Sequence, residues 1–282
     1  MKKVTINDVT LPAVGIGTWH MGDSLINRST EIQAIQAAIN AGATVIDTAE
    51  MYGDGRSENL VGEAIKPYKR DELFLIDKVL PSNASKTKLE HSLDQSLATV
   101  GTDYFDLYLL HWRGGVPLAE TINELERVKK AGKIKAWGVS NFDVADLEEL
   151  WRLKNGKDCV ANEDLYNLDS RGIEFDLLPS MKKHQLPLIA YSPLAQGDRL
   201  SGKLTENPLL KEIAASHHAT ISQIMLAWTL RIGNVLAIPK SSSPKHAEEN
   251  VAAGSIELSD DELLALQKEF PSPTKKEPLA VI

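Results

Sequence analysis

Short apolar segments that end in polar residues, each followed by a helical pattern, recur along the chain and constrain its fold more than any other feature. The clearest example is residues 44–47, a β-branched run that ends at Asp47, with Tyr52 following in a glycine-containing loop. Such segments are predicted strands, and alternating strands and helices favour a parallel sheet. The predicted strands are residues 14–17, 44–47, 73–76, 104–110, 136–139, 160–161, 188–190 and 235–238.

The helical segments between the strands carry recognisable start signals. Thr30 with Gln33 and Ser259 with Glu262 have the spacing of a capping box, and Ser57 and Asp143 are expected to cap helices. Two helices, at about 207–217 and 220–232, are expected before the last strand, and one more runs from Ser259 to about residue 270. Residues 3–6 and 9–11 predict an N-terminal hairpin across one barrel end, with Asn7 and Asp8 in its turn.

Eight strand–helix units in a chain of 282 residues favour closure into a (β/α)8 TIM barrel. The main alternative is an open doubly wound sheet, which usually carries G-x-G-x-x-G after its first strand. Here Gly15 and Gly17 are present and the third glycine is missing, so the barrel is favoured. No break in composition suggests a second domain, and residues 1–282 are expected to form one.

Composition and charge exclude several classes of function. Asp and Glu outnumber Lys and Arg by 39 to 31, for a net charge of −8, which argues against a nucleic-acid partner. The single cysteine, Cys159, cannot form an internal disulfide, and no apolar stretch is long enough to span a bilayer. We expect a soluble cytoplasmic protein, monomeric and without a metal site, that acts on small molecules.

Four polar side chains follow neighbouring predicted strands: Asp47, Tyr52, Lys78 and His111. In a parallel barrel the carboxyl ends of the strands share one rim, so these groups should converge there. A phenol is a poor acid at neutral pH, but a nearby cation such as Lys78 stabilises phenolate and lowers the phenol's pKa. Asp47 should keep Lys78 charged, and His111 could orient a carbonyl oxygen by hydrogen bonding.

At this point the sequence resembles the aldo-keto reductases, NADPH-dependent enzymes built on a (β/α)8 barrel. The resemblance covers nearly the whole chain, through motifs at residues 15–19, 46–53, 75–78, 110–112, 138–142, 190–194 and 238–241. Residues 19–22 and 170–174 resemble a bacterial branch of the family that is associated with methylglyoxal and similar small carbonyl compounds. The resemblance implies an oxidoreductase that reduces small aldehydes, dicarbonyls or ketones with NADPH.

The resemblance also assigns roles to individual residues. Tyr52 would be the general acid, Lys78 and Asp47 its tuning pair, and His111 the group that orients the carbonyl. Residues implied in NADP(H) binding are Gly17, Thr18, Trp19, Ser140, Asn141, Glu163, Tyr191, Ser192, Pro193, Leu194, Lys240, Ser241, Ser243, His246, Glu249 and Asn250. Those implied in substrate binding are Trp19, Met51, Tyr52, His111 and Trp112.

Taken singly, several of these residues have ordinary structural roles open to them. Asn141 could cap a helix, and Tyr191 could be an aromatic residue packed at the barrel rim. Ser241 and Ser243 could be ordinary residues at the entry to a helix. A second class of function also stays open, because the family includes channel-associated subunits that bind the cofactor and act as sensors. The intact set of four catalytic residues favours an enzyme.

Departures from the family pattern set the finer expectations. Glu163 stands where a glutamine usually contacts the nicotinamide carboxamide, and an ionised carboxylate there cannot donate a hydrogen bond. His246 stands where an arginine often binds the 2′-phosphate, which weakens the expected preference for NADPH over NADH. Asp77 precedes Lys78 in place of a small hydroxyl residue, and strand alternation should point it away from the Lys78 side.

Overall fold

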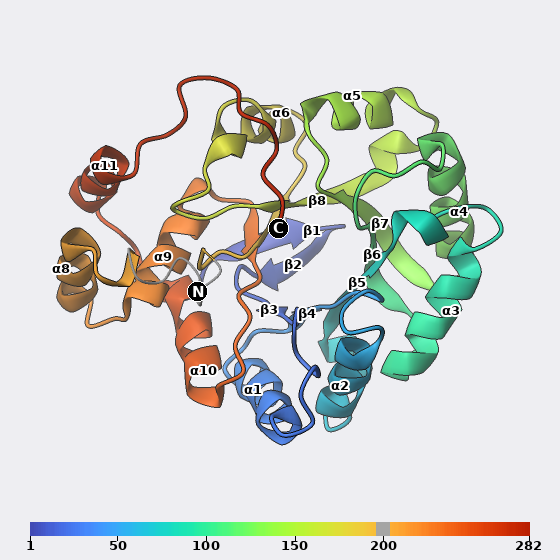
Figure 1. The fold of residues 1–282 in the computed structure, drawn as a ribbon, viewed down its shortest axis with the longest axis horizontal. Helices are drawn as coiled ribbons and strands as arrows, with labels where there is room; N and C mark the ends of the chain where they lie inside the picture. The colour runs from blue at the N-terminus through green and yellow to red at the C-terminus, as the bar shows by residue number, and fades with distance from the viewer. Residues whose placement is uncertain (196–203) are drawn as a thin grey trace.

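The computed structural model describes residues 1–195 and 204–282, and its centre is a closed ring of parallel strands (Figure 1). The strands follow one another in chain order around the ring, and parallel bridges from Val14 to Ala237 and from Gly17 to Lys240 join its first and last members. They are β3 (Ile16–Gly17), β4 (Val45–Asp47), β5 (Phe74–Val79), β6 (Phe105–Leu110), β7 (Ile134–Ser140), β8 (Cys159–Leu165), β9 (Leu188–Tyr191) and β10 (Val235–Ala237). The predicted (β/α)8 barrel is confirmed.

Helices surround the strands on the outside of the ring (Figure 1). They are α1 (Arg28–Asn40), α2 (Arg56–Ile65), α3 (Leu89–Val100), α4 (Leu118–Lys130), α5 (Val144–Arg152), α6 (Leu177–Lys183), α8 (Pro208–Ser216), α9 (Ile221–Thr229), α10 (Pro244–Ala252) and α11 (Asp260–Glu269). Short 3-10 turns are η1 (Arg70–Glu72), η2 (Pro81–Asn83), η3 (Gly156–Asp158), η4 (Gly172–Glu174), η5 (Leu230–Ile232) and η6 (Ala253–Ser255). The extra helices expected before the last strand are α8 and α9, and α11 is the expected C-terminal one.

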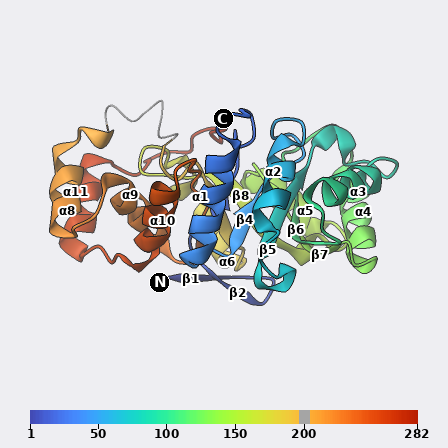
Figure 2. The same ribbon diagram turned by 90° about the horizontal axis from the view of Figure 1, so that it is seen from below.

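The N-terminal hairpin closes one end of the barrel. Strands β1 (Lys3–Ile6) and β2 (Val9–Pro12) pair antiparallel, and the turn residues Asn7 and Asp8 have φ values of 49° and 62°. The hairpin packs its apolar side chains against the inner faces of the strands. Figure 2 shows it at the end of the barrel opposite the C-terminus, which leaves that other end for the site.

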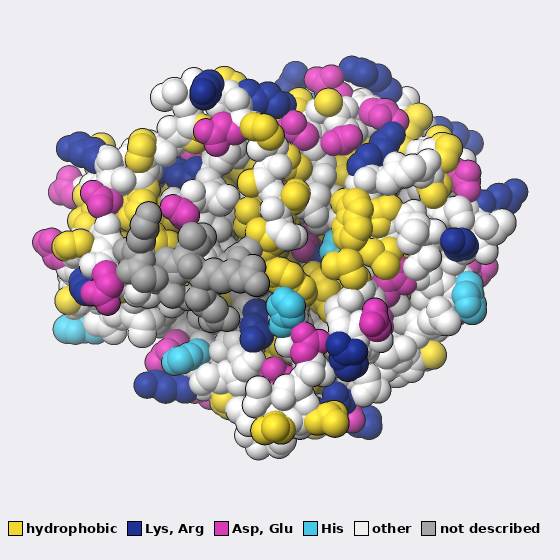
Figure 3. All heavy atoms as spheres, in the orientation of Figure 1, with side chains coloured by type: hydrophobic (Ala, Val, Ile, Leu, Met, Phe, Trp, Pro, Cys, Tyr) yellow, Lys and Arg dark blue, Asp and Glu magenta, His cyan; other side chains and the backbone are white. Residues whose placement is uncertain are grey.

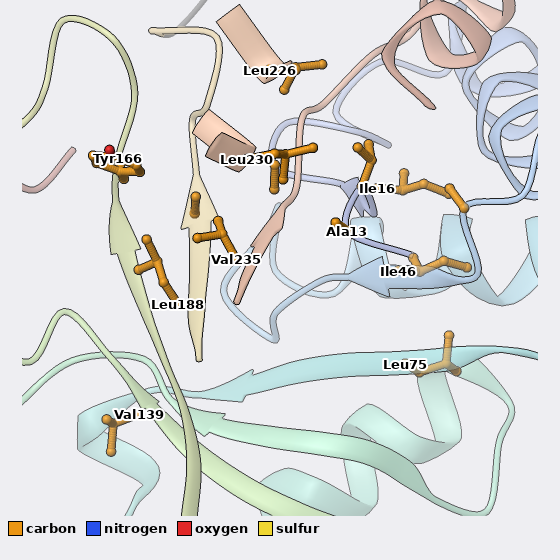
Figure 4. Packing of buried hydrophobic residues seen from close by; sticks show 14 of the residues in the cluster. Ala13, Ile16, Ile46, Leu75, Val139, Tyr166, Leu188, Leu226, Leu230 and Val235 are labelled. Atoms are coloured by element: carbon orange, nitrogen blue, oxygen red, sulfur yellow. The ribbon is translucent and has the colours of Figure 1, made fainter. Parts of the chain in front are cut away.

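Side-chain alternation along the strands separates an inner core from an outer one. In β5, Phe74 and Ile76 belong to the cluster inside the ring, whereas Leu75 and Val79 pack outward against the helices. Figure 4 shows part of this outer cluster, including Ile46, Leu75 and Val139. Because the side-chain period of a strand is two, the residue two positions beyond an inner apolar residue also points inward.

Two predicted helix caps are wrong. Helix α1 begins at Arg28, with Asn27 as its N-cap and no side-chain cap, so Thr30 lies inside the helix. Ser57 lies inside α2, where its buried hydroxyl donates to the backbone oxygen of Thr18 at 3.0 Å. Ser57 bonds to Thr18, and Thr30 lines the cleft described below. Such tertiary contacts override a local capping signal.

Other local predictions are confirmed, although several strands, β8 most of all, are longer than predicted. Asp143 caps α5 in a capping box with Asp146, and Ser259 and Glu262 form the box of α11. Strand β8 runs over seven residues, where the sequence indicated only 160–161. Its polar residues hide the strand pattern, because Glu163 points into the barrel and Asn162 donates to the Phe142 carbonyl at 2.9 Å outside it.

Candidate active site

The barrel's inner rows of side chains end in polar groups at the C-terminal rim. Asp47 follows Val45 by two positions, Lys78 follows Ile76, His111 follows Leu109 and Glu163 follows Ala161, and each of the four apolar residues belongs to the inner core. The same alternation that fills the barrel therefore carries a carboxylate, an ammonium, an imidazole and a second carboxyl group into its mouth.

Lys78 is the centre of this group. Its Nζ donates to both carboxylate oxygens of Asp47 at 2.6 Å, to the Thr48 carbonyl at 3.2 Å and to the Tyr52 hydroxyl at 3.2 Å. Glu163 Oε1 lies 3.3 Å from the same nitrogen. The side chain of Lys78 has no exposed surface, so the position of its charge is fixed by these partners.

The charge state of Lys78 follows from its neighbours. Burial alone would lower its pKa, but the acidic groups around it, with Asp47 the strongest, outweigh burial and raise the pKa of Lys78 well above its usual value. Lys78 is therefore a cation at neutral pH, beside the Tyr52 hydroxyl. This is the role that the sequence predicted for Asp47.

The pKa of Tyr52 behaves differently from the sequence-based expectation. Burial raises the pKa of the phenol above its usual value, and the opposing effect of Lys78 is too small to reverse the shift. The predicted lowering is wrong for the free protein, because the tyrosine is largely buried and the carboxyl groups nearby oppose a further negative charge. Tyr52 therefore keeps its proton at neutral pH.

His111 is neutral at the same rim. Burial, reinforced by the charge of Lys78, lowers its pKa to about 3. Its ring lies edge-on to Tyr52, with 5.8 Å between the ring centres, and its Nδ1 has no hydrogen-bond partner among the described residues. A neutral imidazole that lines the cleft can hydrogen-bond a ligand placed beside the Tyr52 hydroxyl.

A cleft of about 990 Å³ opens above these groups. Apart from Lys78, which lies beneath its floor, every residue that the sequence assigned to catalysis, cofactor or substrate contributes to its lining. Met51 and Trp112 stand partly exposed at its mouth. Figure 3 shows hydrophobic side chains gathered near the middle of this face, over the barrel axis.

A hydrogen-bonded group forms one wall of the cleft beside Tyr52. The Tyr191 hydroxyl donates to Oδ1 of Asn141 at 2.8 Å, and the Asn141 amide donates to the His111 carbonyl at 3.1 Å. Ser140 donates its hydroxyl to the Glu163 carbonyl at 2.9 Å. Asn141 adopts a φ of 57° and does not cap α5, which Asp143 does, so the alternative structural role for Asn141 is excluded.

The opposite arm of the cleft ends at the N-terminus of α10. Ser243 caps this helix, Lys240 and His246 stand exposed beside it, and all three line the cleft. A helix N-terminus next to a lysine favours an anion. Gly17 lets the backbone come close here, because a Cβ atom on it would lie 2.5 Å from the Ile238 carbonyl oxygen.

Several cleft residues were not identified from the sequence. Thr220 and Ser222 enter from the start of α9, Asn27 and Thr30 from the start of α1, and Ile282 from the C-terminus. A backbone hydrogen bond joins Ile282 to the Tyr191 side chain. The capping signal at Thr220 was available in the sequence. Figure 1 shows the C-terminus returning to the barrel mouth, and no local signal in the sequence indicates this.

The C-terminal segment is held in place by charged anchors. Lys276 Nζ lies 2.9 Å from a carboxylate oxygen of Asp143 and 2.9 Å from one of Asp176, and Arg171 contacts Ser272 at 2.9 Å. The anchors join the segment to the loop before α5 and to the residue before α6. Ile282 is thus positioned at the cleft by contacts remote from it.

The cleft fits a long dinucleotide better than a metal ion. Glu163 Oε2 is buried without a hydrogen-bond partner among the described residues, at one end of a cleft whose other end favours an anion. Within residues 1–195 and 204–282, no group of three or more His, Cys, Asp or Glu side chains is arranged to hold a metal. Nor does any helix in these ranges have the length and apolar character needed to cross a membrane.

Residues 13–268 match the aldo/keto reductase family. The chain is 47% identical to methylglyoxal reductase YeaE of Escherichia coli over 98% of this chain and 96% of that protein, and 35% identical to glyoxal reductase of Bacillus subtilis over 91% and 88%. It superposes on an aldo-keto reductase from Klebsiella pneumoniae in complex with NADPH with a TM-score of 0.97, at 45% identity, covering 100% of this chain and 99% of that one.

Proposed function

We propose that this chain, which belongs to the aldo/keto reductase family and is therefore an NADP(H)-dependent oxidoreductase, reduces methylglyoxal and similar small aldehydes, dicarbonyls and ketones to alcohols. One observation carries the proposal: Tyr52 lines the cleft, and its hydroxyl lies 3.2 Å from the buried Lys78 ammonium. The relatives named for methylglyoxal and glyoxal support the choice of small dicarbonyl substrates.

In this proposal the residues divide the work between proton transfer and orientation. Bound NADPH supplies the hydride. Tyr52 is the general acid that protonates the carbonyl oxygen, and the Lys78 cation stabilises the negative charge that is left on the phenol oxygen. Asp47 holds Lys78 in place, and neutral His111 donates a hydrogen bond that orients the carbonyl oxygen.

The cofactor contacts follow the two arms of the cleft. Ser140, Asn141 and Glu163 would hold the carboxamide, and Tyr191 would stack on the nicotinamide ring. Residues 192–194 would lie near the pyrophosphate, together with Gly17, Thr18 and Trp19. Lys240, Ser241, Ser243 and His246 would meet the 2′-phosphate, with Glu249 and Asn250 near the adenine.

The substrate would sit between Trp19, Met51 and Trp112, whose large faces suit small apolar groups beside a carbonyl. The segment between His111 and α4 is short, which leaves the mouth open and supports a broad substrate range.

The test is a panel of carbonyl compounds with purified protein, following the loss of NADPH absorbance. Turnover should be efficient with methylglyoxal and glyoxal and poor with bulky ketones, and NADPH should be preferred to NADH. Tight NADPH binding without turnover on any compound would contradict the proposal and favour a cofactor sensor.

A further inference from the structure

Two carboxyl groups share the single buried ammonium of Lys78. Asp47 comes from β4, the neighbour of β5, whereas Glu163 comes from β8 and reaches Lys78 across the barrel interior. The exposed fractions of Lys78, Asp47 and Glu163 are 0%, 1% and 2%. Water therefore does little to stabilise any charge in this cluster.

Charge balance requires one of these carboxyl groups to hold a proton. Two carboxylates against one ammonium would leave a net negative charge in the barrel interior, which is costly to bury. Asp47 has both oxygens 2.6 Å from Lys78 Nζ, whereas Glu163 has one oxygen at 3.3 Å and the other without a partner among the described residues. The proton therefore belongs on Glu163.

The titration behaviour of Glu163 agrees with this placement. Burial, followed by the nearby charge of Asp47, raises the pKa of Glu163 well above its usual value. Asp47 also faces Glu163: burial raises the pKa of Asp47, and the charge of Lys78, with hydrogen bonds to Lys78 and Glu163, opposes that rise. The remaining groups that face Glu163 are fixed in charge near neutral pH. Lys78 stays positive, His111 stays neutral, and Tyr52 and Tyr191 both have raised pKa values and stay protonated.

Glu163 also borders the place where charge changes during the reaction. It lines the cleft with Tyr52 and Tyr191, and its Oε2 is buried without a hydrogen-bond partner among the described residues. Oxidation turns a neutral nicotinamide ring into a positively charged one. A positive charge near Glu163 favours its ionised form.

We propose that Glu163 is the proton reserve of this site, protonated with reduced cofactor and ionised with oxidised cofactor; the inference rests on the function proposed above. Tyr52 gives its O–H proton to the carbonyl oxygen, Lys78 gives an N–H proton to the phenolate across 3.2 Å, and Glu163 replaces it across 3.3 Å. The alcohol has then gained a hydride from NADPH and a proton from Tyr52. Tyr52 and Lys78 are restored, and a Glu163 carboxylate balances the new positive charge.

The change in the protonation of Glu163 can be measured from cofactor binding alone, without any turnover. Binding of NADP⁺ to the free protein should release about one proton near neutral pH, and its affinity should rise about tenfold per pH unit over the range in which Glu163 ionises. Binding of NADPH should release none from this group. The 2′-phosphate and its contacts are common to both cofactors, so the difference between NADP⁺ and NADPH isolates the effect of the nicotinamide ring.

The experiment is calorimetric titration of the free protein with NADP⁺ and NADPH, in buffers of different ionisation enthalpy and at several pH values. Wild type should show the extra proton with NADP⁺ only, and Glu163→Gln should show equal proton counts for the two cofactors. The matched control is Asp164→Asn, which replaces a fully buried carboxyl of the same strand that points outward, and it should keep the difference. The proposal would be overturned if wild type released equal numbers of protons with the two cofactors. It would also be overturned if the difference between NADP⁺ and NADPH persisted in Glu163→Gln.

A measurement on wild type alone covers the case in which Glu163→Gln fails to fold. Infrared difference spectra should show a protonated carboxyl C=O band that is present with NADPH and lost with NADP⁺. A band unchanged between the two complexes would refute the inference. Neither measurement needs a carbonyl substrate. A failure of the inference about Glu163 can therefore be distinguished from a failure of the proposed reductase activity.

Discussion

Nζ of Lys78 lies 3.2 Å from the hydroxyl oxygen of Tyr52 and 5.1 Å from the centre of the Tyr52 ring, inside the barrel. The lysine charge therefore acts on both the oxygen and the face of the ring. Because Tyr52 keeps its proton in the free protein, Lys78 contributes mainly once negative charge develops on the phenol oxygen during proton transfer.

Replacing Tyr52 by phenylalanine removes the proton donor and leaves the ring in place. We expect kcat for methylglyoxal reduction to fall by a factor on the order of 10²–10⁴, with little change in the dissociation constant of NADPH. Steady-state kinetics and fluorescence titration measure the two quantities. Near wild-type turnover would exclude Tyr52 as the acid.

Replacing Lys78 by methionine leaves Asp47 and Glu163 facing each other without their cation. We expect a strong loss of kcat and a lower melting temperature, because buried carboxyl groups that lose their partner are destabilising. Adding Asp47→Asn to Lys78→Met should restore part of the stability and none of the activity. Thermal denaturation and kinetics of the single and double variants check this, and recovered activity in the double variant would contradict it.

Burial of neutral His111 links stability to pH. Its pKa in the folded protein is about 3, below the value of about 6.5 for an unfolded chain, so the unfolded state binds more protons between these values. The stabilisation is complete above pH of about 6.5 and is lost as pH falls toward 3. His111→Asn should therefore show a shallower loss of unfolding free energy, by on the order of 1.4 kcal/mol per pH unit. Unfolding free energies from denaturant titrations at several pH values check this. The same dependence on pH in wild type and in His111→Asn would contradict it.

His246 stands exposed beside Lys240 at the N-terminal end of α10. A histidine loses its positive charge within the physiological pH range, whereas an arginine keeps it. His246→Arg should tighten NADPH binding several-fold, flatten its dependence on pH from about 6 to 8, and leave NADH binding unchanged. Dissociation constants for both cofactors at matched pH decide this. Parallel NADPH curves would mean that His246 does not contact the 2′-phosphate.

Lys276 anchors the C-terminal segment through Asp143 and Asp176, and the segment ends at the cleft. Since partly exposed ion pairs are worth about 0.2–1 kcal/mol each, Lys276→Gln should raise KM for carbonyl substrates by up to roughly tenfold, with kcat nearly unchanged. The matched control is Lys275→Gln, because Lys275 has no ion pair among the described residues. Equal effects of the two variants would show that the anchor does not act on the cleft.

Strand periodicity explains how much of the site was predictable. A polar residue two positions beyond an inner apolar one must point into the mouth, so Asp47, Lys78 and His111 could be placed from the sequence. Asp77 was also placed correctly: its side chain interacts with Glu58 of α2, outside the barrel. Thr30 and Ser57 were misassigned, because their hydroxyl-bearing side chains fit a local capping pattern that tertiary neighbours override.

The sequence by itself determined the strand–helix alternation, the inward rows of side chains and the residue types at the barrel rim, because these depend on local periodicity and on the closure of eight parallel units. Only the tertiary structure decided that Glu163 reaches Lys78 from across the barrel, that burial raises the pKa of Tyr52, and that Ile282 returns to the cleft beside Tyr191. Distances between residues far apart in the chain, and the exclusion of water around them, arise only when the strands close into a ring.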